Sequence, residues 1–153
     1  MRIQIRAIGR MKSGPEQDLL NLYRKRLPFD LDVVEIDDRK FSSHAETRRQ
    51  EEASALLGSL PAGAAVVALD ERGHALTSRQ FAQRLVDWRD DGRLPVVFVI
   101  GGADGLHRDV RETADLLLGF GSLTWPHMLV RGMLAEQIYR AHSIATGHPY
   151  HRD

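Results

Sequence analysis

The sequence predicts an α/β fold with a mostly parallel sheet and helices on both faces. Segments with strand character alternate with segments of helical periodicity along the chain. Two apolar runs, residues 64–69 (AAVVAL) and 96–100 (VVFVI), lack a polar face, as expected of strands buried on both sides of a parallel sheet. Glycine-rich or polar segments follow these strands, and in such sheets ligands bind beyond the carboxyl ends of the strands.

The N-terminal third is expected to form two strands with a helix between them. Apolar and polar residues alternate over residues 3–7, which is the period of a half-buried strand, and residues 31–36 predict a second strand. Pro15 is suited to the first turn of a helix, and Pro28 ends that helix.

Capping residues predict where the next two helices begin. Ser43 with Glu46 three residues later forms a capping box, and the helix is expected to run to about residue 57. Thr77 or Ser78 is expected to cap the following helix, which buries an apolar face and stops by residue 92.

The last third predicts a short helix over residues 107–114, an apolar run at 116–118, a short β-prone run at 122–125 and a long C-terminal helix. Gly147 fits the end of this helix. Its buried face is expected to comprise Val130, Leu134, Ile138, Ala141 and Ala145.

Length and composition indicate one domain spanning residues 1–153, with 42% apolar and 27% charged residues. The absence of cysteine excludes disulfides and thiol chemistry. The N-terminus lacks the apolar core of a signal peptide and no segment has the length of a membrane span, so we expect a cytoplasmic protein without a membrane partner. The net charge of zero argues against non-specific coating of nucleic acid, and the arginine clusters at 24–26, 39–40 and 48–49 are interpreted as solvated surface.

Three segments are expected to converge on one ligand site at the strand ends: residues 69–73, 101–105 and 119–126. The second, Gly-Gly-Ala-Asp-Gly, does not match a phosphate-binding loop, and Asp104 places a carboxylate where phosphate needs donors. Its glycines therefore suit a close approach to a flat, uncharged or cationic ligand, or a tight turn without any ligand.

Other site chemistries have little support in the sequence. The histidines lack the spacing of a metal site, and no serine lies in a nucleophile elbow, so we expect no metal. His127 shares a helix face with Arg131 and is either functional or a helix-start residue. Glu136 and Arg140 form an i, i+4 pair of the kind usually found as a surface ion pair.

Three stretches in this order, VIGGADGL, SLTWPHMLVRGMLAEQIYRA and the terminal HPYHR, resemble the ribosomal RNA large subunit methyltransferase H family of the SPOUT superfamily. The similarity extends over the whole chain, including the opening MRIQIRAIG and the LDERG that follows the third strand. One departure is Ala103, where many relatives have proline, and it leaves the glycines in place.

This resemblance implies a C-terminal trefoil knot, a homodimer, and S-adenosylmethionine-dependent methylation of N3 of a pseudouridine in helix 69 of 23S rRNA. None of these features follows from periodicity, and the general rule against knotted connections would have argued against the first. Carried over by position, the S-adenosylmethionine pocket comprises Leu69, Gly102, Gly121, Ser122, Leu123, Thr124, Trp125 and Pro126.

The resemblance also suggests a use for the polar tail, which we expect to border the cofactor pocket and to meet the RNA in the dimer. Methylation of N3 requires a group that accepts its proton or donors that stabilise the anion. The candidate bases are His148, His151, His127 and Glu136, among which the sequence does not choose, and the candidate anion stabilisers are Arg152 and Arg140. Tyr150 either stacks on a base or pins the tail to the fold.

The neutral charge favours a substrate in which shape and subunit contacts add to local charge, so we expect activity on assembled ribosomes rather than free rRNA. The main alternative is a non-catalytic ribosome-associated binding protein of the same fold. A flavodoxin-like nucleotide domain is disfavoured by Asp104.

Overall fold

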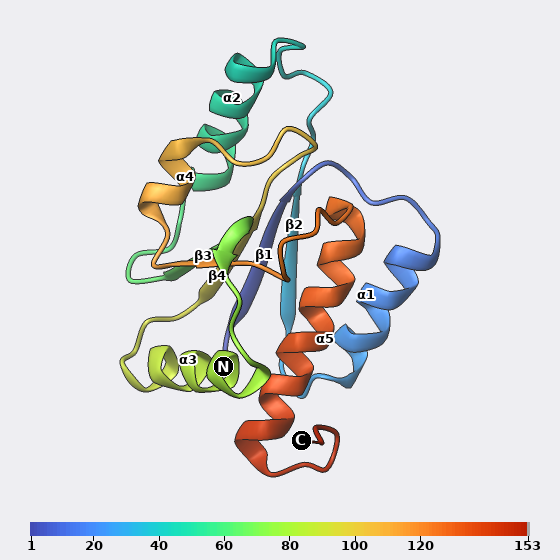
Figure 1. Cartoon of the computed structure of the whole chain (residues 1–153), viewed down its shortest axis with the longest axis vertical. Helices are drawn as coiled ribbons and strands as arrows, with labels where there is room; N and C mark the ends of the chain where they lie inside the picture. Colours follow the sequence, from blue (N-terminus) through green and yellow to red (C-terminus); the bar gives the residue numbers. More distant parts are fainter. Residues whose placement is uncertain (153) are drawn as a thin grey trace.

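Five parallel strands form the central sheet in the order β2-β1-β4-β3-β5 (Figure 1). The computed structural model describes residues 1–152. The strands are β1 (Ile3–Ile8), β2 (Leu31–Ile36), β3 (Ala65–His74), β4 (Val96–Ile100) and β5 (Leu116–Leu118). Strand β4 lies in the middle of the sheet and all its residues are buried, which confirms the expectation drawn from its uninterrupted apolar sequence.

Helices cover both faces of the sheet, as predicted. Their bounds are α1 (Pro15–Arg26), α2 (Ala45–Leu57), α3 (Ser78–Asp90), α4 (Arg108–Thr113) and α5 (His127–Thr146). One apolar core lies between the sheet and α1, α3 and α5, and a second lies between the opposite face and α2 and α4 (Figure 1). Helix α5 packs against both α1 and α3, so the first core is organised around it.

Two helix ends agree with the capping signals in the sequence. Thr77 caps α3, accepting a hydrogen bond from the Gln80 N–H, and the Gln80 side chain accepts one from the Thr77 N–H. Gly147 ends α5 with φ 71°, a left-handed conformation in which glycine has no Cβ penalty.

The capping box expected at Ser43 is wrong. Helix α2 begins at Ala45 with His44 as the N-cap residue, and no side chain caps it. Glu46, which should have completed the box, pairs instead with Arg49 one turn later. A local ion pair therefore replaced the reciprocal hydrogen bonds that the spacing indicated.

The segment after the buried part of β3 was predicted to be a loop, but β3 continues through it to His74 with an irregularity between Leu69 and His74. At Gly73, a Cβ atom would lie 2.7–2.8 Å from backbone atoms at the end of β5. Because only glycine permits that approach, the extension of β3 depends on a tertiary contact that the local sequence does not reveal.

Two expectations for the C-terminal region also need correction. Residues 122–125 do not form a strand; they are exposed and have no neighbouring strand to pair with. Ala145 is exposed and does not belong to the buried face of α5; in the last turn Ser143 is buried and Ile144 packs against the core instead. The rest of the predicted face, from Val130 to Ala141, is buried.

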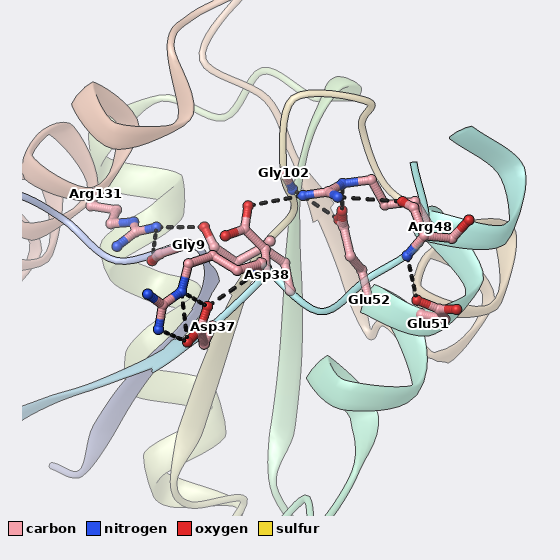
Figure 2. Close-up of polar contacts among 11 residues, drawn as sticks. Gly9, Asp37, Asp38, Arg48, Glu51, Glu52, Gly102 and Arg131 are labelled. Carbon is pink, nitrogen blue, oxygen red and sulfur yellow. Dashed lines mark hydrogen bonds and ion pairs between the residues drawn. The ribbon is translucent and has the colours of Figure 1, made fainter. Parts of the chain in front are cut away.

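Arg131 is fully buried near the start of α5 and anchors this helix to the strand ends. Its Nη2 group donates to the carbonyls of Ile8 (2.7 Å) and Gly9 (2.9 Å), and its Nη1 group donates to Glu35 Oε2 at 2.8 Å. Figure 2 shows the guanidinium beside Gly9. A buried charge with these partners fixes the position of the first turns of α5 relative to β1 and β2.

We expect Arg131→Met to lower the free energy of unfolding by about 2–4 kcal/mol, the cost of leaving two buried acceptors unsatisfied. The substitution leaves the Ile8 and Gly9 carbonyls without the Arg131 donor, while the partly exposed Glu35 keeps the Met11 N–H. Chemical denaturation would measure the change in the free energy of unfolding. The control is Arg108→Met, because Arg108 is exposed and pairs only within its own helix, so no measurable change is expected there. Equal losses in both variants would contradict the anchoring role.

Candidate functional site

The three segments expected to converge do meet, around a cavity of about 1070 Å³ at the carboxyl edge of the sheet. The end of β3, the turn after β4 and the chain between β5 and α5 form most of its wall. His127 and Val130 add the first turn of α5, and Glu46 and Arg49 add a margin from α2. The cavity lies where parallel sheets of this kind bind ligands.

The residues assigned to the cofactor pocket by resemblance are almost all in this wall. Ser122 is the one assigned residue that does not line the cavity. The assigned residues that line it are Leu69, Gly102, Gly121, Leu123, Thr124, Trp125 and Pro126.

Hydrogen bonds hold the segment between β5 and α5 in place although it has no regular structure. Trp125 Nε1 donates to the Phe120 carbonyl at 3.1 Å, and Thr124 Oγ1 donates to Glu71 Oε2 at 2.6 Å. Leu123 is 71% exposed and Trp125 is 39% exposed. The rim of the cavity therefore presents two apolar side chains to solvent, which is suited to contact with a large partner.

The floor of the cavity carries an ionised carboxylate. Burial alone would raise the pKa of Asp70, but hydrogen bonds from the Arg72 side chain and backbone outweigh this and lower it. Asp70 therefore stays charged, with both its carboxylate oxygens paired with Arg72. The wall also carries the acids Glu46, Glu71 and Asp104 and the arginines 49, 108 and 111, so it combines charges of both signs with apolar groups and glycine backbone.

His127 is the one candidate base that lines this cavity. Burial, followed by the nearby Arg131 charge, lowers the pKa of His127 against a weaker opposing effect of Asp38. Its Nδ1 atom is buried and has no hydrogen-bond partner. The imidazole is therefore neutral near pH 7 and has the capacity to accept a proton.

The other expected catalytic residues gather elsewhere, along the C-terminal half of α5. The Tyr150 hydroxyl donates to Glu136 Oε1 at 3.0 Å and lies 3.1 Å from the Tyr23 hydroxyl. The ring of Tyr150 packs edge-on against Tyr139, with the Arg140 guanidinium 4.9 Å from its centroid. Tyr150 thus pins the tail to the fold of its own chain.

Glu136 is poorly placed to act as a base. Its Oε1 atom accepts hydrogen bonds from Arg140 Nε (3.1 Å), Arg140 Nη2 (2.6 Å) and the Tyr150 hydroxyl, and its Oε2 atom accepts one from Gln137. The Glu136–Arg140 pair is also only partly exposed, so it is more than the simple surface ion pair that the spacing indicated.

Within one chain, the tail and the cavity are separate. His148 Nδ1 accepts from the Tyr150 N–H, His151 Nδ1 lies 3.2 Å from Arg140 Nη1, and Arg152 is exposed. None of residues 148–152 lines the cavity, to which α5 contributes only its first turn. Figure 1 shows the C-terminus at the end of α5 remote from this edge of the sheet.

A second cavity of about 430 Å³ lies among α1, α3 and α5 and shares a wall with the first. Residues 118 and 120–121 line both cavities, and Tyr23 and Glu136 line the second. The segment after β5 therefore separates the candidate cofactor cavity from the cluster that holds the tail.

The sequence analysis did not identify the buried charges behind the site, Arg131 and Glu52, or the partly buried pair Arg48 and Asp38. Arg48 was interpreted as solvated surface, but its side chain is only 24% exposed and pairs with both Asp38 and Glu52. A signal for Glu52 existed, because it lies four residues before the buried Leu56 and so shares its helix face.

Among the described residues 1–152, no group of three or more metal-ligating side chains is assembled, and no helix has the length and hydropathy needed to cross a membrane. The expectation of a metal-free site stays a prediction.

Comparison with known proteins agrees with this geometry over the whole chain. A family model described as "Predicted SPOUT methyltransferase" matches residues 1–151. A protein of Rhodospirillum centenum is 56% identical, one of Paramagnetospirillum magneticum 55% and one of Allorhizobium ampelinum 51%, each over 99% of both chains. All three are named ribosomal RNA large subunit methyltransferase H. The chain therefore belongs to the SPOUT methyltransferase family and is an enzyme of that class.

Proposed function

We propose that this enzyme transfers a methyl group from S-adenosylmethionine to N3 of a pseudouridine in helix 69 of 23S rRNA, within assembled ribosomes of the cytoplasm. The observation that carries the proposal is the convergence of the three strand-end segments on one cavity that also holds a neutral histidine. The names of the relatives support large-subunit rRNA as the substrate. The trefoil knot stays a prediction from the resemblance, and the single-domain organisation stays a prediction from length and composition.

The cavity wall fits the cofactor in size and chemistry. Its volume is in the range of sites that enclose small ligands, and its backbone-rich glycine segments allow a flat group to approach closely. When bound, S-adenosylmethionine supplies the methyl group. The residues that would hold the cofactor belong to the three segments and include Leu69, Gly102, Gly121 and residues 123–126.

The protein must dispose of the N3 proton as the new N–CH₃ bond forms. His127 is the base that the structure favours, because it lines the cavity, is neutral and has an unpartnered buried nitrogen. Glu136 is saturated with donors in its own chain, and the tail histidines lie outside this cavity.

A homodimer in which the tail of each subunit acts at the cavity of its partner gives the tail residues and Arg140 a role in the reaction. The tail is held on α5 and does not reach the cavity of its own chain. In such a dimer His148, His151 and the guanidiniums of Arg140 and Arg152 face the RNA, where the arginines stabilise the anion that forms on the base. Tyr150 then acts by ordering the tail rather than by stacking on RNA.

Transfer of labelled methyl from S-adenosylmethionine to ribosomes lacking the modification tests the main proposal. We expect label on N3 of a helix-69 pseudouridine, identified after nuclease digestion. Free 23S rRNA should be methylated with a kcat/KM lower by about tenfold or more, because a chain with zero net charge lacks the field needed to hold naked RNA. Equal turnover on both substrates would contradict the ribosome preference. Cofactor binding without transfer would favour the non-catalytic alternative.

The role of His127 predicts a pH dependence with a defined sign. Since burial holds the folded-state pKa of His127 below its ordinary 6.5, the rate on ribosomes should start to fall only below about pH 6.5. His127→Gln should reduce kcat by about 10²–10⁴-fold and leave the S-adenosylmethionine Kd within about twofold.

The same shift predicts a stability effect. Wild-type protein should lose stability relative to His127→Gln as the pH falls from 6.5 through the lower folded-state pKa, because unfolding releases the histidine to bind its proton.

For the rate measurement, a His127→Gln enzyme with unchanged kcat would remove His127 from the mechanism and leave the tail histidines as the candidates.

Transfer of function between subunits tests the dimer. Gly121→Val strains a cavity-wall glycine at φ 94°, and Arg152→Ala removes an exposed tail cation, so either homodimer should be impaired. A heterodimer of the two variants, co-expressed and purified through different tags, contains one site with an intact cavity and an intact partner tail. We expect it to regain about half the wild-type rate, each site contributing independently. An inactive heterodimer would show that the tail acts on its own chain, and a monomer in light scattering would overturn the dimer.

A further inference from the structure

Glu52 is a buried acid in the middle of α2, 2% exposed, on the face that packs against the sheet. Neighbouring positions on that face, Ala53 and Leu56, belong to the apolar core between the sheet, α2 and α4. A carboxylate removed from water is costly unless it is paired and hydrogen-bonded. An apolar residue at this position would avoid the free-energy cost of burying a charge, so packing alone does not explain why an acid is found here.

The carboxylate bridges α2 to the turn that follows β4. Its Oε2 atom accepts a hydrogen bond from the Gly102 backbone N–H at 3.3 Å, and its Oε1 atom lies 3.2 Å from Arg48 Nε. Arg48 in turn donates through Nη2 to Asp38 Oδ2 at 3.0 Å. Figure 2 shows the three side chains gathered beside Gly102.

Arg48 and the Gly102 N–H offset only part of the cost of burying this carboxylate. Burial raises the pKa of Glu52, and the Gly102 N–H and the Arg48 charge, which lower it, do not outweigh this effect; Asp104 and Asp38 add smaller upward effects. Arg48 is shared by Glu52 and Asp38, so a cation stands between the two acids. The favourable partners of the carboxylate are thus Arg48 of α2 and the backbone of the turn after β4.

Gly102 is shaped to receive this carboxylate. A Cβ atom there would lie 3.1 Å from each Glu52 oxygen and 3.3 Å from Ile8 Cγ2, which is tighter than ordinary contact. The Gly101–Gly102 peptide is planar and trans, so an N–H held by Glu52 turns the Gly101 carbonyl in the opposite direction. The Gly105 N–H closes the turn on the Gly102 carbonyl at 3.1 Å, and all of residues 100–106 line the cavity.

We propose that Glu52 is a positioning residue for the cofactor cavity, fixing the Gly101–Gly102 peptide in the orientation that receives S-adenosylmethionine. The inference rests on the proposed function, because the cavity is taken to be the S-adenosylmethionine site. Glu52 itself does not line the cavity and touches no reacting atom. A merely structural role would make Glu52 matter for stability alone, whereas positioning makes it matter for cofactor affinity even where stability is preserved.

Three variants of the full-length protein separate these roles. Glu52→Leu removes the acceptor and the buried charge, Glu52→Asp keeps the charge but withdraws it from Gly102, and Glu52→Gln keeps an acceptor at the same reach. The matched control is Glu51→Leu, which changes the adjacent acid; its contact is with the Ser42 N–H, away from Gly102. Calorimetric Kd for S-adenosylmethionine, KM and kcat on unmodified ribosomes, and Tm are measured for each.

We expect Glu52→Leu and Glu52→Asp to raise the S-adenosylmethionine Kd and KM by about tenfold, with a smaller effect on kcat, since a charge-assisted hydrogen bond is lost. The Tm of Glu52→Leu should fall modestly, because the Gly102 N–H loses its acceptor while Arg48 keeps Asp38 as a partner. Glu52→Gln should restore the Kd to within about threefold of wild type. Glu51→Leu should bind as wild type does.

Wild-type affinity in Glu52→Leu or, where that variant does not fold, in Glu52→Asp would overturn the inference and leave the proposed function intact. A Glu52→Gln protein that binds as weakly as Glu52→Leu would also overturn it, because the acceptor would then be irrelevant. A wild-type protein that does not bind S-adenosylmethionine would instead overturn the proposed function, and this inference with it.

Discussion

The arginine buried at the start of α5 is the contact on which the arrangement of the site depends. Arg131 places all its charge inside the protein, where only the carbonyls at the end of β1 and the Glu35 carboxylate of β2 satisfy it. A helix held in this way cannot slide or rotate without leaving a buried charge unpaired, which is far more costly than losing an apolar contact. The first turn of α5 therefore forms a fixed wall of the cavity, and His127 is carried by that wall.

A second buried charge acts on the opposite side of the same sheet edge. Glu52 reaches the turn after β4 from α2, as Arg131 reaches the end of β1 from α5. In both cases a long side chain from a helix satisfies backbone groups just beyond the strands, where the ladder of strand hydrogen bonds has ended. The edge of the sheet can thus combine loop-like openness with a defined backbone, which a preformed ligand site requires.

Much of the fold was accessible from the sequence because its signals were local. The uninterrupted apolar run of β4, the helix cap expected at Thr77 or Ser78 and the terminal Gly147 each reflect energetics within a few residues, and each was confirmed, with Thr77 as the cap. The failures have the opposite character. Glu46 pairs with Arg49 instead of completing the capping box. At Gly73, the close contact with the end of β5 accompanies the continuation of β3. Residues 122–125 have strand propensity but no partner strand.

The site divides in the same way. The sequence predicts that ligand-binding segments follow the central strands, and its motifs identify the family and much of the cavity wall, although not the residues that α2 and α4 contribute. Three features appear only in the folded molecule: Glu136 and Tyr150 are hydrogen-bonded to each other, His127 and the tail lie apart within one chain, and Arg131 and Glu52 lie behind the wall. The physical reason is that strand and helix patterns depend on near neighbours, whereas the partner of a buried charge is chosen by three-dimensional proximity. Arg131 and Glu35, for example, are 96 residues apart in the chain and meet only once the sheet has formed.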